Sequence, residues 1–423
     1  MCFYCNEFVC TAWCFIIITF SLFVSSHIQD YSRVLTVFKL ASSSPFFAQT
    51  FLKMSSSDGT TTTTENNINT NMPTVQRTFL SSSDPDGGVR LECDVYRPPK
   101  QQRERREETK TKHVFVCLHA HGKLGASRQM LKPHSIMLAK RGFVVYNVSF
   151  RGCDGNKSTS NASLVGDVDA KDVLEIVREI REEREKAEDG IVVKINVLGY
   201  SFGSAVAASA VGLLHEKFMN AENEEEEEKL WSRYGIDAVI LVGFPLGSLN
   251  PFATTVMGFL SRFLLGKHAG RLRKCFSRSA RNRGVVARKT RLFFVHGQRD
   301  EFTRSKEVRK FCQKLAKGQP EEEDEEDEED EEDESKNEKQ SSVANHLAEF
   351  FFGVDDDEND SEDDDDDVER PVESSFETFG NDRENAEPLA LLEIKGNKSD
   401  HFGFVKIKRQ RDLLVKCASK FVL

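Results

Sequence analysis

The sequence contains no internal repeat, and no acidic or histidine cluster at metal-ligand spacing matches its one His-x-His pair. The first absence excludes a solenoid or a propeller, because those folds need self-similar units. The second argues against a resident metal. His119 and His121 form a His-x-His pair, but no matching acid or histidine follows at ligand spacing. We therefore expect neither a metal nor a cofactor, and a packing role for His119.

Paired cysteines are also scarce. Four of the ten cysteines fall within the first 14 residues, and the other six include no Cys-x-x-Cys pair. This spacing is typical of reduced, mostly buried thiols rather than of a disulfide scaffold. We expect an intracellular protein, with the cytoplasm as its first location. The six scattered cysteines are Cys93, Cys117, Cys153, Cys275, Cys312 and Cys417.

Positive charge is almost missing from one segment. Residues 321–367 hold 27 acids and two lysines, so their net charge is −25. The whole chain has a net charge of −11, so all other residues together carry +14. The acidity of the whole protein is thus a property of one insert and says nothing about the fold. The remainder is long enough for one α/β domain of about 250–300 residues.

Lysine and arginine are also missing before the longest apolar run, residues 8–24. The run suits a signal peptide or a short membrane anchor, but its flank argues against secretion. Met54 offers another start, which would make residues 1–53 a transit-like extension. An anchor, a targeting peptide and a Met54 start all stay open, so membrane-anchored and organellar locations are the alternatives. The Thr-, Asn- and Ser-rich residues 55–73 are predicted to be disordered.

Apolar runs alternate with helical patterns from residue 74 to residue 423. Continuous apolar runs are typical of strands buried on both faces of a parallel sheet. The alternation predicts a doubly wound, mostly parallel α/β sheet in one domain over 74–423, after an N-terminal extension over 1–73. The predicted strands are 75–80, 89–96, 113–118, 142–148, 191–198, 238–242, 292–295 and 389–394, and the predicted helices are 130–141, 165–186 and 411–421.

Two charged segments interrupt this alternation. Residues 262–291 hold eleven Lys/Arg and no acid. A solvated helical excursion is favoured there over contacts with nucleic acid, a membrane surface or the acidic insert. The insert, residues 319–387, is predicted to be a disordered acidic loop, with binding to a basic protein partner as the alternative. A smaller acidic run, residues 224–228, is assigned to another loop.

The most informative motif is Gly-Tyr-Ser-Phe-Gly at residues 199–203. A predicted strand precedes it, and a run of small residues suited to a close-packed helix follows. A Gly-x-Ser-x-Gly in this context predicts a nucleophile elbow, in which Ser201 is exposed at the carboxyl edge of the sheet. The backbone N–H of Phe202, at the helix start, is placed to stabilise developing negative charge.

A nucleophilic serine needs a base and an orienting acid. Asp300 follows the predicted strand at 292–295, and His401 follows the strand at 389–394 after a short loop. Both therefore fall at the same edge of the sheet as Ser201, in the chain order Ser, Asp, His. The alternative for Asp300 is to cap the helix that follows it. Asp400 stands beside His401, but only the histidine can serve as base.

Four blocks resemble the α/β-hydrolase superfamily, and in particular the serine hydrolases related to dienelactone hydrolases, serine aminopeptidases and acyl esterases. They are residues 119–125, residues 149–152, the elbow, and residues 296–300 with Asp400 and His401. The resemblance implies Ser201 as nucleophile, Asp300 as orienting acid and His401 as general base. It also implies an oxyanion hole from the N–H groups of Phe202 and His121, with Lys123 as the alternative to His121.

The expected function is that of a serine hydrolase that cleaves an ester, thioester or amide of a small acyl substrate. Two alternatives stay open. In one the fold is an inactive scaffold that binds partners through its charged inserts. In the other the protein is a membrane-anchored lipid esterase that uses residues 8–24 as its anchor. Nucleic acid is not expected as a partner, because the basic segment has few aromatics and no recognisable binding module.

Overall fold

The structure is a computed structural model. It describes residues 72–83, 89–100, 102, 111–120, 126–153, 166–187, 191–246, 267–276, 285–300, 303–318, 372–379, 389–395, 399 and 403–423. The predictions for residues 8–24, Met54 and 55–71 lie outside these ranges, as does most of the acidic insert.

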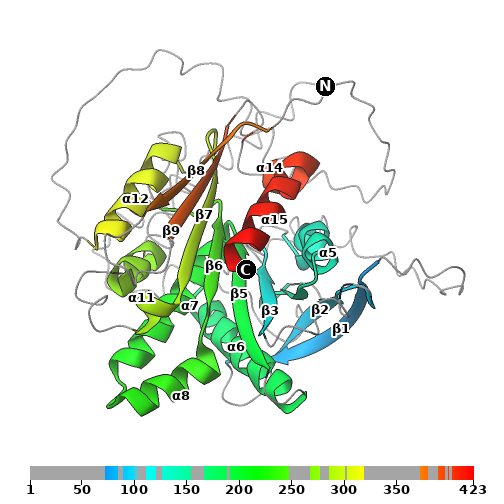
Figure 1. Cartoon of the computed structure of the whole chain (residues 1–423), viewed down its shortest axis with the longest axis vertical. Coiled ribbons are helices and arrows are strands. Elements are labelled where there is room, and N and C mark those ends of the chain that lie inside the picture. Colours follow the sequence, from blue (N-terminus) through cyan, green and yellow to red (C-terminus); the bar gives the residue numbers. More distant parts are fainter. Residues whose placement is uncertain are drawn as a thin grey trace, which may run out of the picture. The chain divides into compact units, whose positions relative to one another are not determined.

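The described residues form one nine-stranded sheet with the order β1-β2-β4-β3-β5-β6-β7-β9-β8 (Figure 1). The six strands from β4 to β9 in this order run parallel, whereas β1 and β2 at one edge and β8 at the other pair antiparallel. The predicted doubly wound, mostly parallel sheet is thus confirmed. The strands are β1 Thr74–Ser81, β2 Arg90–Arg97, β3 Thr111–Leu118, β4 Val144–Val148, β5 Val192–Tyr200, β6 Ala238–Val242, β7 Arg291–Gly297, β8 Ser374–Phe379 and β9 Leu389–Ile394.

Helices cover both faces of this sheet. One core joins α6, α7 and α12 to one face, and a second core joins α5, α14 and α15 to the other. Neighbours on one strand alternate between the two, since Val114 belongs to the first core and Phe115 to the second. The helices are η2 Arg128–Leu131, α5 Lys132–Lys140, α6 Asp167–Ala187, α7 Phe202–Met219, α8 Glu224–Tyr234, α11 Val285–Lys289, α12 Ser305–Lys317, α14 Gly403–Lys406 and α15 Lys408–Val422.

The acidic run at 224–228 forms the first turns of α8, so its assignment to a loop is wrong. Asn223 is the N-cap, and its Oδ1 accepts the Glu226 N–H at 2.9 Å. The glutamates lie at the positive end of the helix dipole, where negative charge is stabilising. Repulsion within the run is therefore outweighed by the cap and by the dipole.

Residues 374–379 form the edge strand β8, within a stretch assigned to the disordered insert. Each β8 residue pairs with β9 in antiparallel register, from Ser374 opposite Ile394 to Phe379 opposite Leu389. The Phe376 ring lies 5.9 Å from the Phe293 ring on β7, centroid to centroid. Four of the six residues of β8 are polar, and its two phenylalanines stand three residues apart instead of two, so the strand pattern in the sequence is weak.

The basic segment is helical over residues 267–276 and again in α11. It is not solvated there, because His268 and Leu272 are completely buried. Lys267 and Arg271 each approach a carboxylate oxygen of Asp167 on α6 at 2.5 Å. The ion pairs of Lys267 and Arg271 with Asp167 therefore hold the basic segment against α6.

Across the described ranges, no helix is both long and apolar enough to cross a membrane.

Candidate active site

Ser201 stands between β5 and α7 with φ 52° and ψ −117°. It is the one non-glycine residue with positive φ in the part of the chain that the structure describes. Such a conformation costs about 1–3 kcal/mol and persists only where the surroundings impose it. Here the Ser201 N–H donates to Val242 O on β6 at 2.8 Å. The sharp turn from strand to helix is the geometry of a nucleophile elbow.

The two glycines of the motif are required by close backbone approach. A Cβ on Gly199 would lie 2.3 Å from Gly203 O, and a Cβ on Gly203 would lie 2.3 Å from Leu118 O. Both distances are far below van der Waals contact. The start of α7 is therefore pressed against the carboxyl end of β3, where the loop bearing the second predicted oxyanion donor begins.

Phe202 is the first residue of α7. N–H groups of a first helical turn point out of the helix start, which is the positive end of its dipole. The Phe202 ring packs edge-on against Phe150, with centroids 5.6 Å apart. The elbow is thus held against the segment that follows β4.

His119 follows β3 and is completely buried. Its Nε2 accepts the Phe150 N–H at 3.2 Å, and its Nδ1 lies 2.6 Å from Ala120 O. A backbone amide only donates and a carbonyl only accepts, so Nδ1 carries the proton and the ring is neutral. His119 therefore holds the chain just after β3, and just before residues 121–125, against Phe150. His121 and Lys123 themselves lie outside the described residues.

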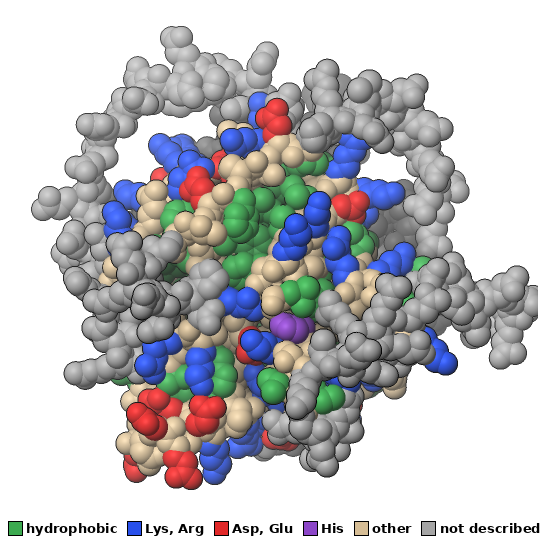
Figure 2. Space-filling model, viewed as in Figure 1, with side chains coloured by type: hydrophobic (Ala, Val, Ile, Leu, Met, Phe, Trp, Pro, Cys, Tyr) green, Lys and Arg blue, Asp and Glu red, His purple; other side chains and the backbone are tan. Residues whose placement is uncertain are grey.

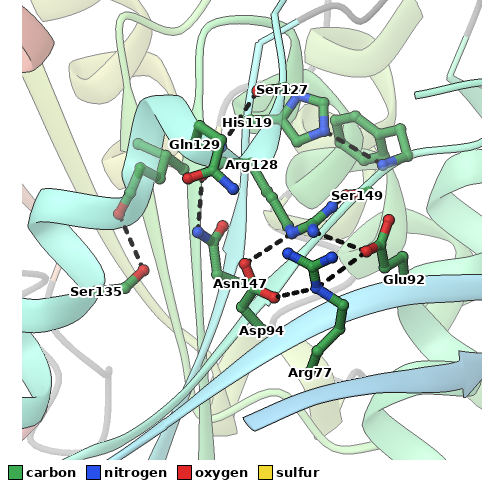
Figure 3. Close-up of polar contacts among 12 residues, drawn as sticks. Arg77, Glu92, Asp94, His119, Ser127, Arg128, Gln129, Ser135, Asn147 and Ser149 are labelled. Atoms are coloured by element: carbon green, nitrogen blue, oxygen red, sulfur yellow. Dashed lines mark hydrogen bonds and ion pairs between the residues drawn. The ribbon is translucent and has the colours of Figure 1, made fainter. Parts of the chain in front are cut away.

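Arg128, at the other end of that loop, is the centre of a buried charge network (Figure 3). Its Nε donates to Asp94 at 2.8 Å, its Nη2 to Glu92 at 2.8 Å and its Nη1 to Ser149 Oγ at 2.9 Å. The more exposed Arg77 approaches the same two carboxylates from β1 at 3.2 and 3.4 Å. Two arginines thus face two buried carboxylates, Arg128 from within the core and Arg77 from the surface.

The two ends of the loop thus meet one short segment, residues 147–150. His119 binds Phe150 at one end. At the other end Arg128 binds Ser149 through its side chain, and its carbonyl accepts from Asn147 Nδ2 at 2.8 Å. We call this arrangement the loop clamp: His119, Arg128 and residues 147–150. The Arg128 end of the clamp was not predicted from the sequence. Glu92 and Asp94, two residues apart on a strand and so on one face, were the available signal.

Asp300 follows β7, and its side chain is completely buried. Its Oδ1 accepts the Thr303 N–H at 3.1 Å, and His296 Nδ1 lies 3.8 Å from its Oδ2. His296 Nε2 in turn lies 2.9 Å from Thr303 O. The alternative role of Asp300 as a cap for the next helix is wrong, because the N-cap of α12 is Arg304 and no side chain caps it.

His401 lies outside the described residues, but the chain on both sides of it is placed. Ser399 O accepts the Arg299 N–H at 3.1 Å, one residue before Asp300. Beyond the histidine, Phe404 O on α14 lies 2.9 Å from His134 Nε2 on α5. Burial and the nearby Arg411 lower the pKa of His134 to about 3, so it stays a neutral donor. Ser399, two residues before His401, therefore lies beside Arg299, the residue that precedes Asp300.

Residues 108–242, which span β3 to β6 and include Ser201, match the family model described as "Putative serine esterase (DUF676)". No curated protein matches the sequence. The match covers about a third of the chain and supports a serine hydrolase, and the strand order with the elbow is that of the α/β-hydrolase fold.

Similar solved structures include three hydrolases. The Pyrococcus furiosus esterase Pf2001 has 16% identity and a TM-score of 0.36, over 58% of this chain and 79% of that chain. Xanthomonas campestris XC6422, a serine hydrolase without a lid, has 14% identity and a TM-score of 0.32, over 56% and 78%. Brefeldin A esterase, a bacterial homologue of human hormone-sensitive lipase, has 15% identity and a TM-score of 0.39, over 60% and 69%.

Proposed function

We propose that this protein hydrolyses small carboxylic esters by two-step acyl transfer, with Ser201 as nucleophile, His401 as general base and Asp300 as orienting acid. The observation that carries the proposal is the strained Ser201 backbone at the end of β5. Asp300 lies at the end of β7, and Ser399, two residues before His401, is hydrogen-bonded beside it.

In the first step His401 takes the Ser201 Oγ proton while Oγ attacks the ester carbonyl carbon. The carbonyl oxygen becomes an oxyanion that accepts hydrogen bonds from the Phe202 N–H and the His121 N–H, with the Lys123 N–H as the alternative second donor. The intermediate collapses, the C–O bond to the alcohol breaks, and His401 returns its proton to the leaving alkoxide. Water then attacks the acyl-enzyme with the same base and releases the carboxylic acid and Ser201.

Asp300 suits the role of orienting acid because its carboxylate is removed from water. A carboxylate beside an imidazole fixes the tautomer and stabilises the imidazolium that forms in each step. The Thr303 N–H and His296 contacts fix the direction of the carboxylate. The role of the loop clamp in this mechanism is to hold both ends of the segment that supplies the second oxyanion donor.

A fluorophosphonate probe tests the nucleophile. We expect the wild-type protein to be labelled at Ser201, and Ser201→Ala to lose both labelling and ester hydrolysis. Ser232→Ala, which removes an exposed hydroxyl on α8, is the matched control and keeps both. A well-folded protein that the probe does not label would refute the activity and favour the inactive scaffold.

A panel of p-nitrophenyl esters with graded acyl chains, run beside matched thioesters and amides, then defines the bond and the acyl length. We expect esters to be cleaved faster than the matched amides, because an alkoxide or phenoxide leaves with less help from the protonated base than an amide nitrogen does. An enzyme that cleaves amides or thioesters but not esters would overturn the ester assignment while leaving the nucleophile in place.

A further inference from the structure

Helix α12 carries a row of positive side chains on its outer face. Lys306, Lys310 and Lys317 are exposed and spaced four and seven residues apart, so they line one side of the helix. Arg304, just before the helix, is also exposed. We call these four residues the basic stripe. Lys and Arg side chains gather over the place of α12 in Figure 2. The inner face holds the buried Val308, Phe311, Cys312 and Leu315.

Glu377 and Glu393, the acids of β8 and β9 that meet α12, are engaged on its inner side, and Glu307 in the first turn of α12 forms no ion pair with the stripe. Arg309 pairs with Glu377 on β8 at 3.0 Å and with Glu393 on β9 at 2.6 Å. Ser305 donates to the other oxygen of Glu393 at 2.6 Å. Lys306, Lys310 and Lys317 form no ion pair with any residue that the structure describes. The stripe thus carries positive charge that is not balanced within the described part of the fold.

The path of the chain ties the acidic insert to this stripe. Helix α12 follows β7 and packs on β7, β8 and β9, so it runs back from the carboxyl edge of the sheet to the amino edge. The chain leaves α12 at Gly318 and rejoins the sheet at β8, whose first residue, Ser374, pairs with the last residue of β9. The intervening chain therefore begins at one end of the stripe and ends at the carboxyl edge, near the other end.

The distance to be spanned is short. A 13-residue helix is about 20 Å long, and residues 319–371 are far more chain than that needs. Two fixed ends beside the same helix give a connecting segment a high effective concentration at its surface. That segment includes residues 321–367, with 27 acids and two lysines.

We propose that the acidic segment 321–367 docks on the basic stripe of α12 in the same molecule. The interaction is electrostatic and multivalent, because many interchangeable carboxylates face four fixed cations. No single acid is required, and the contact weakens as salt screens the charges. Bound in this way, the segment neutralises a surface that would otherwise attract other polyanions.

Carbodiimide cross-linking of the full chain tests the contact directly. The reagent condenses a carboxylate with an amine that touches it, with loss of water, and mass spectrometry locates the amide formed. We expect links from 321–367 to Lys306, Lys310 and Lys317 at about 0.02 M salt and their loss at about 0.5 M. The variant K306R/K310R/K317R keeps the charge but removes the amines, so it controls for the chemistry.

Cleavage by a Glu-specific protease measures the same contact through its energetics. Reversing the stripe with K306E/K310E/K317E should speed cleavage within 321–367 by about tenfold at low salt and leave the high-salt rate unchanged. The matched control is K408E/K416E/K420E on α15, which makes the same change in net charge at exposed lysines on another helix. The control should cleave at the wild-type rate, and a thermal melt checks that each variant is folded.

Three results would overturn the proposal. Cross-links to α15 lysines, or equal effects of the two reversals, would place the segment elsewhere or make the attraction non-specific. Links between isotopically labelled and unlabelled chains in a mixture would make the contact intermolecular. A segment that forms no low-salt links and is cut at the same rate in every variant would leave the stripe without this occupant and favour a basic partner protein.

Discussion

At the scale of single residues, the elbow depends on the absence of a side chain at Gly203. A Cβ there would lie 2.3 Å from Leu118 O, so Gly203→Ala must push α7 away from β3. Because a displacement of about 1 Å can cost a factor of 100 in rate, we expect kcat/KM to fall at least about 100-fold. Hydrolysis of a p-nitrophenyl ester and probe labelling measure this. An active G203A enzyme would show that the elbow tolerates the shift.

His119 gives a second residue-scale prediction, for a positioning role through the loop clamp. His119→Ala leaves the buried Phe150 N–H without its acceptor, which costs about 1–3 kcal/mol of unfolding free energy. We expect kcat to fall about 10–100-fold with little change in KM, since the loop that bears the oxyanion donor loses its anchor. His119→Gln restores an acceptor near the Nε2 position and should recover part of kcat. The control is His215→Ala. His215 is also a buried histidine, but it lies on α7, and its substitution should leave kcat unchanged.

At the scale of elements, α5 holds α14 through His134, and this contact has a defined pH dependence. Burial lowers the pKa of His134 from 6.5 to about 3. Above pH 6.5 the ring is neutral in both states, so the shift has no effect. As the pH falls below 6.5 the unfolded chain binds a proton that the folded chain does not, and stability decreases towards pH 3. We expect a loss of about 2–3 kcal/mol between pH 7 and pH 4.5 from this group.

Urea unfolding of the wild type and of His134→Asn across that range measures the effect. The variant starts less stable, because the bond to Phe404 is altered, but it should lose about 2–3 kcal/mol less on acidification. Parallel curves for the two proteins would show that His134 titrates normally or is not the group that responds.

Elements also show why the sequence predicted some parts of this protein and not others. The parallel strands and the elbow were predictable because each is written in local pattern, as an apolar run or as a Gly-x-Ser-x-Gly. Strand β8 was not predictable, because its own sequence pattern is weak. Its stability comes from pairing with β9 and from the contact between Phe376 and the Phe293 ring on β7. The glutamates of α8 were assigned to a loop because of their charge alone. Asn223, directly before them, is a favoured N-cap residue and was a signal in the sequence for the start of a helix.

The clamp was hidden for a related reason. His119 and Arg128 act through partners on β2 and in residues 147–150, and nothing in the local sequence of either residue indicates which partner it meets. The prediction that Ser201, Asp300 and His401 share one edge of the sheet needed no such knowledge, because parallel strands of one sheet end at the same edge. The roles of Ser201 as nucleophile, Asp300 as orienting acid and His401 as base stay predictions.

At the scale of the whole molecule, the acidic segment makes two opposing contributions to the stability of the fold. Replacing residues 321–367 with a 12-residue Gly/Ser linker shortens the loop between α12 and β8 about threefold, which favours folding by about 0.6–1 kcal/mol through closure entropy. The same replacement removes docking on the basic stripe, which stabilises the fold only where salt does not screen it. Urea unfolding at about 0.5 M salt should therefore show the shortened protein more stable by about 0.6–1 kcal/mol. At about 0.02 M the gain should vanish or reverse, because the docking contribution is then lost with the segment. A gain of the same size at both salt concentrations would mean that the segment adds only loop length, and that α12 keeps its positive charge for something outside this chain.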